Sequence, residues 1–294
     1  MPKAIITGAT GYIGSHVVRE LLRNGWKVSI ISQPEFGYDN ISDIKDKLEI
    51  FEYSGCIADL IQFFRYSDAD VVMHLAAAVI TNYTSEQVSV LINSNIAFGT
   101  QILEAMKQSS VKLFVGTGSY WQNFNSDNYN PVDLYAATKE AFEKILQYYV
   151  DACGIRAITL RLYDVYGEDD RRPKLWTLLR DIAGTGRVLD ISAGDQYLDM
   201  IHVQDVAKAF IAAYNRLVYH CVAKNEVFAV RSGHLMKLKD IVGKFQNIIG
   251  KEILLNWGGR PYKSREVMSP NETIPLIPDW QAEVSLEEGF ARFI

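Results

Sequence analysis

The sequence predicts an α/β protein built on a doubly wound parallel sheet. Three observations predict this fold: short apolar runs alternate with amphipathic stretches, glycines join the first run to the first amphipathic stretch, and the alternation loosens after about residue 166. Strands that alternate with helices pair in parallel through right-handed crossovers, which places helices on both faces of the sheet. The looser second half predicts a smaller domain of mixed α/β structure.

The first half of the chain supplies the strands and helices of this sheet. The clearest apolar runs predict strands at residues 4–7, 28–31, 70–75, 111–115 and 157–162. Amphipathic stretches between them predict helices at residues 13–22, 96–106 and 136–150. We expect residues 1–166 to form the first domain, joined by parts of 199–232.

The second half is denser in glycine and proline, and its helical segments mix with short strands. Helices are expected at residues 175–182, 203–217 and 238–249. Residues 257–280 are rich in proline and charge, which predicts a surface loop with aromatic anchors. Residues 167–294 are therefore expected to form the second domain, which would bind the substrate.

The composition is that of an ordinary globular protein, with 48% hydrophobic and 22% charged residues among 294. The net charge of -5 argues against nucleic acid as a partner.

Lys3 leads directly into the first strand and no apolar run is long enough to cross a bilayer, so we expect a cytoplasmic protein with no membrane partner. Cys56, Cys153 and Cys221 are expected to be free thiols, and no residue cluster has the spacing of a metal site.

A glycine-rich turn directly follows the first strand. Its G-x-x-G-x-x-G spacing allows a sharp exit from the strand, close approach of a pyrophosphate and tight packing of the next helix on the sheet. That helix points its first backbone N–H groups at the phosphates. Because the turn stands between a strand and a helix, it predicts a Rossmann-type dinucleotide site. The expected contacts in this segment come from Gly8, Thr10, Gly11, Tyr12, Ile13 and Gly14.

The end of the second strand carries the group that distinguishes the two dinucleotides. A carboxylate there accepts a hydrogen bond from the adenosine ribose and favours NAD. This strand ends with Ser32, Gln33 and Pro34, and Ser32 could hydrogen-bond a 2'-phosphate. Glu35 is close enough to take the acidic role if the loop folds back. We therefore expect NADP(H) as the preferred cofactor, with NAD(H) as the alternative.

Tyr135 and Lys139 are four residues apart on a predicted helix and so share one face. An unperturbed phenol has a pKa of about 10, and a nearby ammonium favours the phenolate, which makes the proton available near neutral pH. The pair comes after the segment 114–119, which leaves the carboxyl end of a strand, where open α/β sheets bind ligands. The two residues therefore predict acid–base catalysis.

Further motifs occur in a fixed order along nearly the whole chain, at residues 74–77, 95–100, 161–167, 199–206 and 257–262. With the glycine turn, Thr117 and the Tyr135/Lys139 pair, they resemble the extended short-chain dehydrogenase/reductases of the NAD-dependent epimerase/dehydratase family, which act on nucleotide sugars. Residues 134–143 and 171–175 are most similar to reductases of CDP- or dTDP-linked 4-keto-6-deoxyhexoses, such as the CDP-abequose and CDP-paratose synthases. These enzymes make deoxysugars for surface polysaccharides such as the O-antigen of lipopolysaccharide.

The resemblance implies a role for each motif residue. Tyr135 would exchange the proton, Lys139 would support it and contact the nicotinamide ribose, and Thr117 would hydrogen-bond the substrate oxygen, with Ser119 as a rival. Further cofactor contacts would come from Ser32, Asp59 at the adenine, Leu75, Ala76, Ala77 and Asn95. Substrate contacts would come from Ser119, Tyr120 and, at the diphosphate, from candidates among Arg171, Arg172, Arg231 and Arg260. Arg231 and Arg260 are preferred because both are close to glycines in predicted loops.

The positions after Thr117 bear on the reaction. Dehydratases of this family need an acidic pair there, and Gly118 and Ser119 cannot serve as acids. We therefore expect reduction of a C4 keto group by NAD(P)H, with a nucleotide-sugar 4-epimerase as the alternative. A non-catalytic dinucleotide-sensing protein is more remote, because it has no need of Tyr135 and Lys139. The family also implies a homodimer formed through the helices at 96–106 and 136–150.

Overall fold

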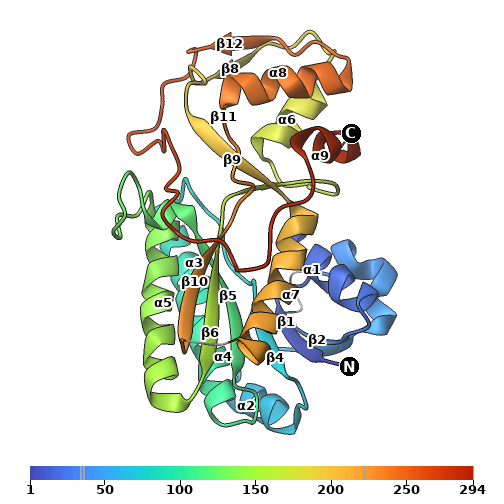
Figure 1. Ribbon diagram of the computed structural model, residues 1–294, viewed down its shortest axis with the longest axis vertical. Coiled ribbons are helices and arrows are strands. Elements are labelled where there is room, and N and C mark those ends of the chain that lie inside the picture. The colour runs from blue at the N-terminus through green and yellow to red at the C-terminus, as the bar shows by residue number, and fades with distance from the viewer. Residues whose placement is uncertain (34, 36, 221–222, 294) are drawn as a thin grey trace.

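A seven-stranded parallel sheet forms the centre of the larger body in the computed structural model, which describes residues 1–33, 35, 37–220 and 223–293 (Figure 1). Pro34 and Cys221, named above, lie outside the described residues. The strands are β1 (Lys3–Thr7), β2 (Lys27–Ser32), β3 (Glu49–Glu52), β4 (Val71–His74), β5 (Leu113–Ser119), β6 (Arg156–Leu162) and β10 (Asn225–Val230). Their order across the sheet is β10-β6-β5-β4-β1-β2-β3. The order reverses between β1 and β4, and ligands bind at the carboxyl ends of strands beside such a reversal.

Helices cover both faces of this sheet, and two apolar cores result. On one face lie α1 (Tyr12–Arg23) and α7 (Val203–Tyr219); on the other lie α2 (Ile57–Tyr66), α4 (Phe98–Lys107) and α5 (Leu134–Cys153). Successive side chains of β1 point to opposite faces of the sheet, so both faces are apolar. Ala4 and Ile6 pack in the first core, whereas Ile5 packs in the second. The predicted doubly wound fold is confirmed.

The second sheet places β9 (Tyr197–His202) between β7 (Asp164–Tyr166) and antiparallel β11 (Leu235–Lys237), and β8 (Leu189–Ile191) pairs with β12 (Leu255–Trp257). Around these strands pack α6 (Leu175–Ile182), α8 (Leu238–Ile249) and α9 (Leu286–Phe293), over a core that includes Trp176, Phe245 and Phe290. This smaller mixed α/β body lies above the large sheet in Figure 1. The exact domain boundaries stay a prediction.

The chain between β12 and α9 contains no helix or strand and returns to the larger body (Figure 1). It docks against β10, where the Ala229 amide donates to the Pro275 carbonyl at 2.8 Å, and Trp280 packs against the core beside α1 and α7. The loop therefore joins the two bodies. Among the described residues, none of the helices is both long and apolar enough to cross a membrane.

Two elements near the site differ from the sequence prediction. The strand expected at 111–115 runs from Leu113 to Ser119, because β6 continues to pair with it past both glycines. The helix expected from residue 96 begins at Phe98, after α3 (Val88–Ile92) and one turn of π-helix, Asn93–Ala97. Thr117 and Ser119 thus lie on a strand, two residues apart on one face.

Candidate active site

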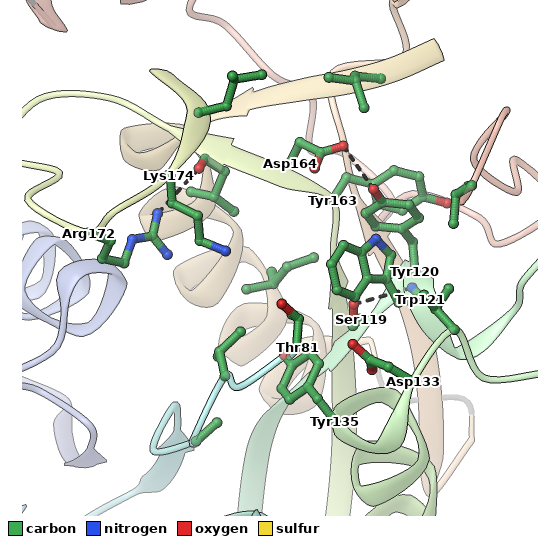
Figure 2. Close-up of a pocket in the computed structure, with 18 of the residues that line it drawn as sticks. Thr81, Ser119, Tyr120, Trp121, Asp133, Tyr135, Tyr163, Asp164, Arg172 and Lys174 are labelled. Atoms are coloured by element: carbon green, nitrogen blue, oxygen red, sulfur yellow. Dashed lines mark hydrogen bonds between the residues drawn. The ribbon is translucent and has the colours of Figure 1, made fainter. Parts of the chain in front are cut away.

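A cleft of about 950 Å³ opens beside the carboxyl ends of β1, β4 and β5 and extends to residues of the smaller body (Figure 2). Twelve of the residues expected at the site line it, namely Gly8, Gly11, Tyr12, Ile13, Gly14, Leu75, Ala77, Thr117, Ser119, Tyr120, Tyr135 and Arg172. The cleft thus brings the glycine turn and the proposed acid–base residues to one place.

The glycine turn has no space for a side chain at Gly8 or Gly14. A Cβ on Gly14 would lie 2.0 Å from the Gly8 carbonyl oxygen, and one on Gly8, where φ is +72°, would lie 2.6 Å from the Ala76 nitrogen. Gly11 immediately precedes α1, whose first turn therefore opens on the cleft. This bare backbone at a helix N-terminus fits the pyrophosphate of a dinucleotide.

Hydrogen bonds of the Asn95 side chain connect the segment after β4 to α5. Its side chain accepts from the Ala78 amide at 2.7 Å and donates to the Ala78 carbonyl and the Thr138 hydroxyl. Beside it, the Ala76 amide donates to the Thr7 hydroxyl, which also bonds His74 Nδ1 at 2.8 Å. Burial lowers the pKa of His74 to about 3, so this ring is neutral and structural.

Three other expected cofactor residues lie away from the cleft lining. Asp59 is exposed in the first turn of α2, and Ser32 is buried at the end of β2. Thr10 is half-buried, and its carbonyl accepts from the Asn40 side chain. Their contacts with a dinucleotide stay a prediction.

The start of α5 positions Tyr135 and Lys139. Asp133 caps the helix by accepting from the Ala136 amide at 2.9 Å, and Tyr135 lines the cleft one turn before Lys139. Lys139 is buried and donates to the Thr117 hydroxyl at 3.1 Å. Burial lowers the pKa of Lys139 to about 8, against the opposing effect of Glu143, so the ammonium form predominates at neutral pH.

The pKa of Tyr135 depends on burial and on the charges around it. Burial, followed by the Asp133 carboxylate, raises this pKa above its ordinary value, and Arg172 opposes them. The Lys139 ammonium is directed at the Thr117 hydroxyl. Tyr135 is therefore a protonated phenol in this structure, the state required of a proton donor.

Thr117 and Ser119 both line the cleft but have different partners. The Thr117 hydroxyl lies between Lys139 and the His74 carbonyl, whereas the Ser119 hydroxyl accepts from the Trp121 amide and caps the short helix Tyr120–Gln122. Between them, a Cβ on Gly118 would lie within 3 Å of Gln122, Glu143 and Arg161. No acidic side chain fits at that position without displacing these groups.

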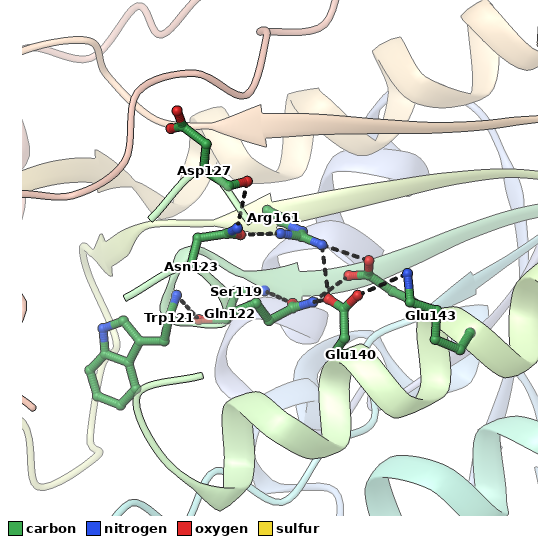
Figure 3. A network of polar contacts seen from close by, with 9 residues as sticks. Ser119, Trp121, Gln122, Asn123, Asp127, Glu140, Glu143 and Arg161 are labelled. Atoms are coloured by element: carbon green, nitrogen blue, oxygen red, sulfur yellow. Dashed lines mark hydrogen bonds and ion pairs between the residues drawn. The ribbon is translucent and has the colours of Figure 1, made fainter. Parts of the chain in front are cut away.

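Those groups belong to a polar network behind the cleft (Figure 3). Arg161 bonds Glu143 at 2.8 Å and Glu140 at 3.2 Å, and it also donates to Asn123. Gln122 donates to both carboxylates and accepts from the Ser119 amide. The network ties α5 to the ends of β5 and β6.

The cationic residues that line the cleft differ from the arginines expected from the sequence. Arg171 and Arg260 are exposed, and Arg231 pairs with Glu272 at 3.1 Å and Asp199 at 3.6 Å; none of the three lines the cleft. Arg172, Lys174, Lys263 and Arg265 line it instead. Of these only Arg172 was a candidate from sequence, because Lys263 and Arg265 arrive through the return of the loop after β12.

The guanidinium group of Arg172 is held in position by Asp170 and Tyr12. Asp170 binds its guanidinium twice, at 2.6 and 2.7 Å, and the group lies 4.3 Å above the Tyr12 ring. Arg172 thus connects the glycine turn with the substrate side of the cleft. Within the described part of the chain, no group of His, Cys, Asp and Glu could hold a metal ion.

Comparisons with known proteins agree with this geometry. The model of the NAD dependent epimerase/dehydratase family matches residues 4–222. The chain is 26% identical to a CDP-abequose synthase of Yersinia pseudotuberculosis over 92% of each chain, and 26% identical to a UDP-glucose 4-epimerase of Lactobacillus helveticus over 88% and 85%. Its fold resembles that of the UDP-glucuronic acid 4-epimerase of Bacillus cereus in complex with NAD, with a TM-score of 0.82 and 23% identity over 99% and 94% of the chains.

Proposed function

Because this chain belongs to the NAD dependent epimerase/dehydratase family, we propose that it reduces the C4 keto group of a CDP- or dTDP-linked 4-keto-6-deoxyhexose. One observation carries the proposal: Tyr135 and the Lys139–Thr117 pair meet beside the glycine turn in one cleft. The packing around Gly118 supports reduction over dehydration, because an acidic side chain at this position would have to displace Gln122, Glu143 and Arg161. The product would be a deoxysugar nucleotide for surface polysaccharides.

Each residue of the site has one task in this reaction. The dinucleotide, when bound against the glycine turn, supplies the hydride for C4. Tyr135 donates its proton to the oxygen that becomes a hydroxyl. Thr117 hydrogen-bonds the same oxygen, and Lys139 holds Thr117 in place while its charge favours the developing phenolate.

The substrate diphosphate requires cations, and the cleft supplies Arg172, Lys174, Lys263 and Arg265. Guanidinium groups bind phosphate oxygens in a forked geometry. We propose that these four replace Arg171, Arg231 and Arg260 as the diphosphate ligands.

A nucleotide-sugar 4-epimerase is the second candidate, because epimerase relatives are as similar to this chain as the CDP-abequose synthases are. An epimerase retains its dinucleotide and returns the hydride to the sugar, whereas a reductase releases oxidised cofactor after each turnover. Purified protein with tightly bound NAD and no consumption of NAD(P)H would favour the epimerase.

The preference for NADPH rests on Ser32 and Gln33 alone. The solved relative named above holds NAD and gives this preference no support. A higher kcat/KM with NADH than with NADPH would contradict it.

The decisive experiment is a substrate panel. CDP-, dTDP-, GDP- and UDP-linked 4-keto-6-deoxyhexoses are each mixed with the protein and NADH or NADPH, and absorbance is followed at about 340 nm. Loss of absorbance with a CDP or dTDP sugar is the expected result, and no loss with any sugar would contradict the proposal.

A further inference from the structure

Asp164 is a carboxyl of the cleft that the proposed reaction does not use. It begins β7, lines the cleft on the wall opposite Tyr135, and accepts a hydrogen bond from the Tyr120 hydroxyl at 3.1 Å (Figure 2). Among the described residues, Tyr120 is the only one recorded as a hydrogen-bond partner of this carboxyl. Its second oxygen is therefore available to a ligand.

The position of this carboxyl is fixed by rigid neighbours. Tyr120 is buried, its ring stacks on Tyr163 with 4.8 Å between centroids, and the Tyr163 hydroxyl donates to the Asn271 carbonyl. A strand residue held by a packed phenol keeps its geometry when a ligand binds. This is the condition for a group that selects between ligands rather than adapting to them.

The charges that face Asp164 come from three further elements. Lys174 precedes α6, Glu266 belongs to the loop after β12, and Asp199 lies on β9, the strand that pairs with β7. Asp199 is already occupied by the Ser232 amide and hydroxyl and by the Gly233 amide. Burial raises the pKa of Asp164 to about 7, and Asp199 and Glu266 add to this effect against Tyr120 and Lys174.

We propose that Asp164 determines which hexose the cleft accepts: it admits a sugar with an uncharged group at C6 and excludes a hexuronate. This inference rests on the proposed nucleotide-sugar substrate. A methyl or hydroxymethyl group at C6 carries no charge, and a hydroxyl there can donate to an ionised Asp164. A second carboxylate at the same place would be repelled and poorly solvated. Selectivity of this kind depends on the unfavourable contact with the wrong ligand as much as on the favourable one.

Binding of matched sugar pairs tests the inference. The dissociation constants of glucose and glucuronate linked to the same nucleotide (UDP, CDP or dTDP) are measured by calorimetry with the dinucleotide-loaded protein. The unmodified chain should prefer glucose about tenfold or more at pH 8. Asp164→Asn keeps the shape of the side chain and an acceptor for Tyr120, and it should reduce that preference to nearly one.

Asp133→Asn is the matched control, because it removes another cleft carboxyl and keeps an efficient helix cap. It should leave the glucose preference unchanged. In the unmodified chain the preference should also weaken as the pH falls from 8 to 5.5, since Asp164 becomes protonated, and the Asp164→Asn protein should show no such change.

Three results would overturn the inference. They are equal binding of both sugars by the unmodified chain, an undiminished preference in Asp164→Asn, and relaxation of the preference by Asp133→Asn instead. If nucleotide sugars bind with the expected selectivity but no 4-keto sugar is reduced, the proposed reaction fails and the inference stands. If no nucleotide sugar binds, both fail.

Discussion

Tyr135 is the residue on which the proposed chemistry depends most directly. We expect Tyr135→Phe to lower kcat by about 10²–10⁴-fold, because a positioned general acid contributes this much to proton transfer. Dinucleotide affinity should change little, since the glycine turn is untouched. Steady-state rates on the best keto sugar and fluorescence titration with NAD(P)H measure the two properties. Near-normal turnover would contradict the assignment of the acid.

Thr117 and Ser119 are both candidates for the hydrogen bond to the substrate oxygen, and their different hydrogen-bond partners favour Thr117. Thr117 shares its hydroxyl with Lys139, whereas Ser119 caps a backbone amide. Thr117→Ala should therefore cost activity, at most about 2.7–4 kcal/mol as for an oxyanion donor. Ser119→Ala should act mainly on stability, by about 1 kcal/mol as for other caps. Measuring kcat/KM and the thermal midpoint of both variants shows which hydroxyl serves the reaction. A larger loss of kcat/KM in Ser119→Ala would assign the substrate hydrogen bond to Ser119.

At the scale of elements, the Arg161 network holds α5 against the sheet. Arg161 and Glu140 are buried and Glu143 is half-buried, and removal of Arg161 would leave the two carboxylates without their shared cation. We expect Arg161→Met to reduce the free energy of unfolding by about 3–5 kcal/mol in urea titrations, the usual cost of breaking a buried pair.

Arg260→Met is the control for this loss, because Arg260 is exposed, and it should stay within about 0.5 kcal/mol of the unmodified protein. A variant that replaces Arg161 by Met and both glutamates by Leu should regain much of the lost stability. If Arg161→Met alone proves neutral, the carboxylates must be hydrated or protonated, and the network does not anchor α5.

At the scale of the whole molecule, the surface near α3 and α5 predicts the oligomeric state. Val90 and Tyr148 are 49% and 57% exposed, and the two helices that carry them pack side by side. We expect a homodimer through this surface at micromolar concentration, measured by light scattering. Replacing both residues by Arg should give a monomer, because unpaired charges would be buried at the interface.

Tyr219→Arg is the matched control for the dimer, since Tyr219 is 72% exposed at the end of α7, on the opposite face of the sheet. It should leave the mass unchanged. A monomeric unmodified chain would contradict the prediction outright.

Local patterns in the sequence were enough to predict the sheet, the glycine turn and the Tyr135/Lys139 pair. Periodicities of two and 3.6 residues reflect which side chains face a core, so they can be read within one segment. The resemblance to the family is confirmed by its model over residues 4–222. Strand β3 was not identified, because Glu49–Glu52 has two acidic ends and becomes a strand only through pairing with β2.

The tertiary structure alone decided the substrate side of the cleft. Lys263, Arg265 and Glu266 reach it because the loop after β12 returns to the larger body, and Asp164 meets Tyr120 across 44 positions. It also decided that Lys139 faces Thr117 and that Tyr135 stays protonated. Loops have no periodic pattern that reports their path, and a pKa depends on burial and on distant charges, so neither can be derived from residue order.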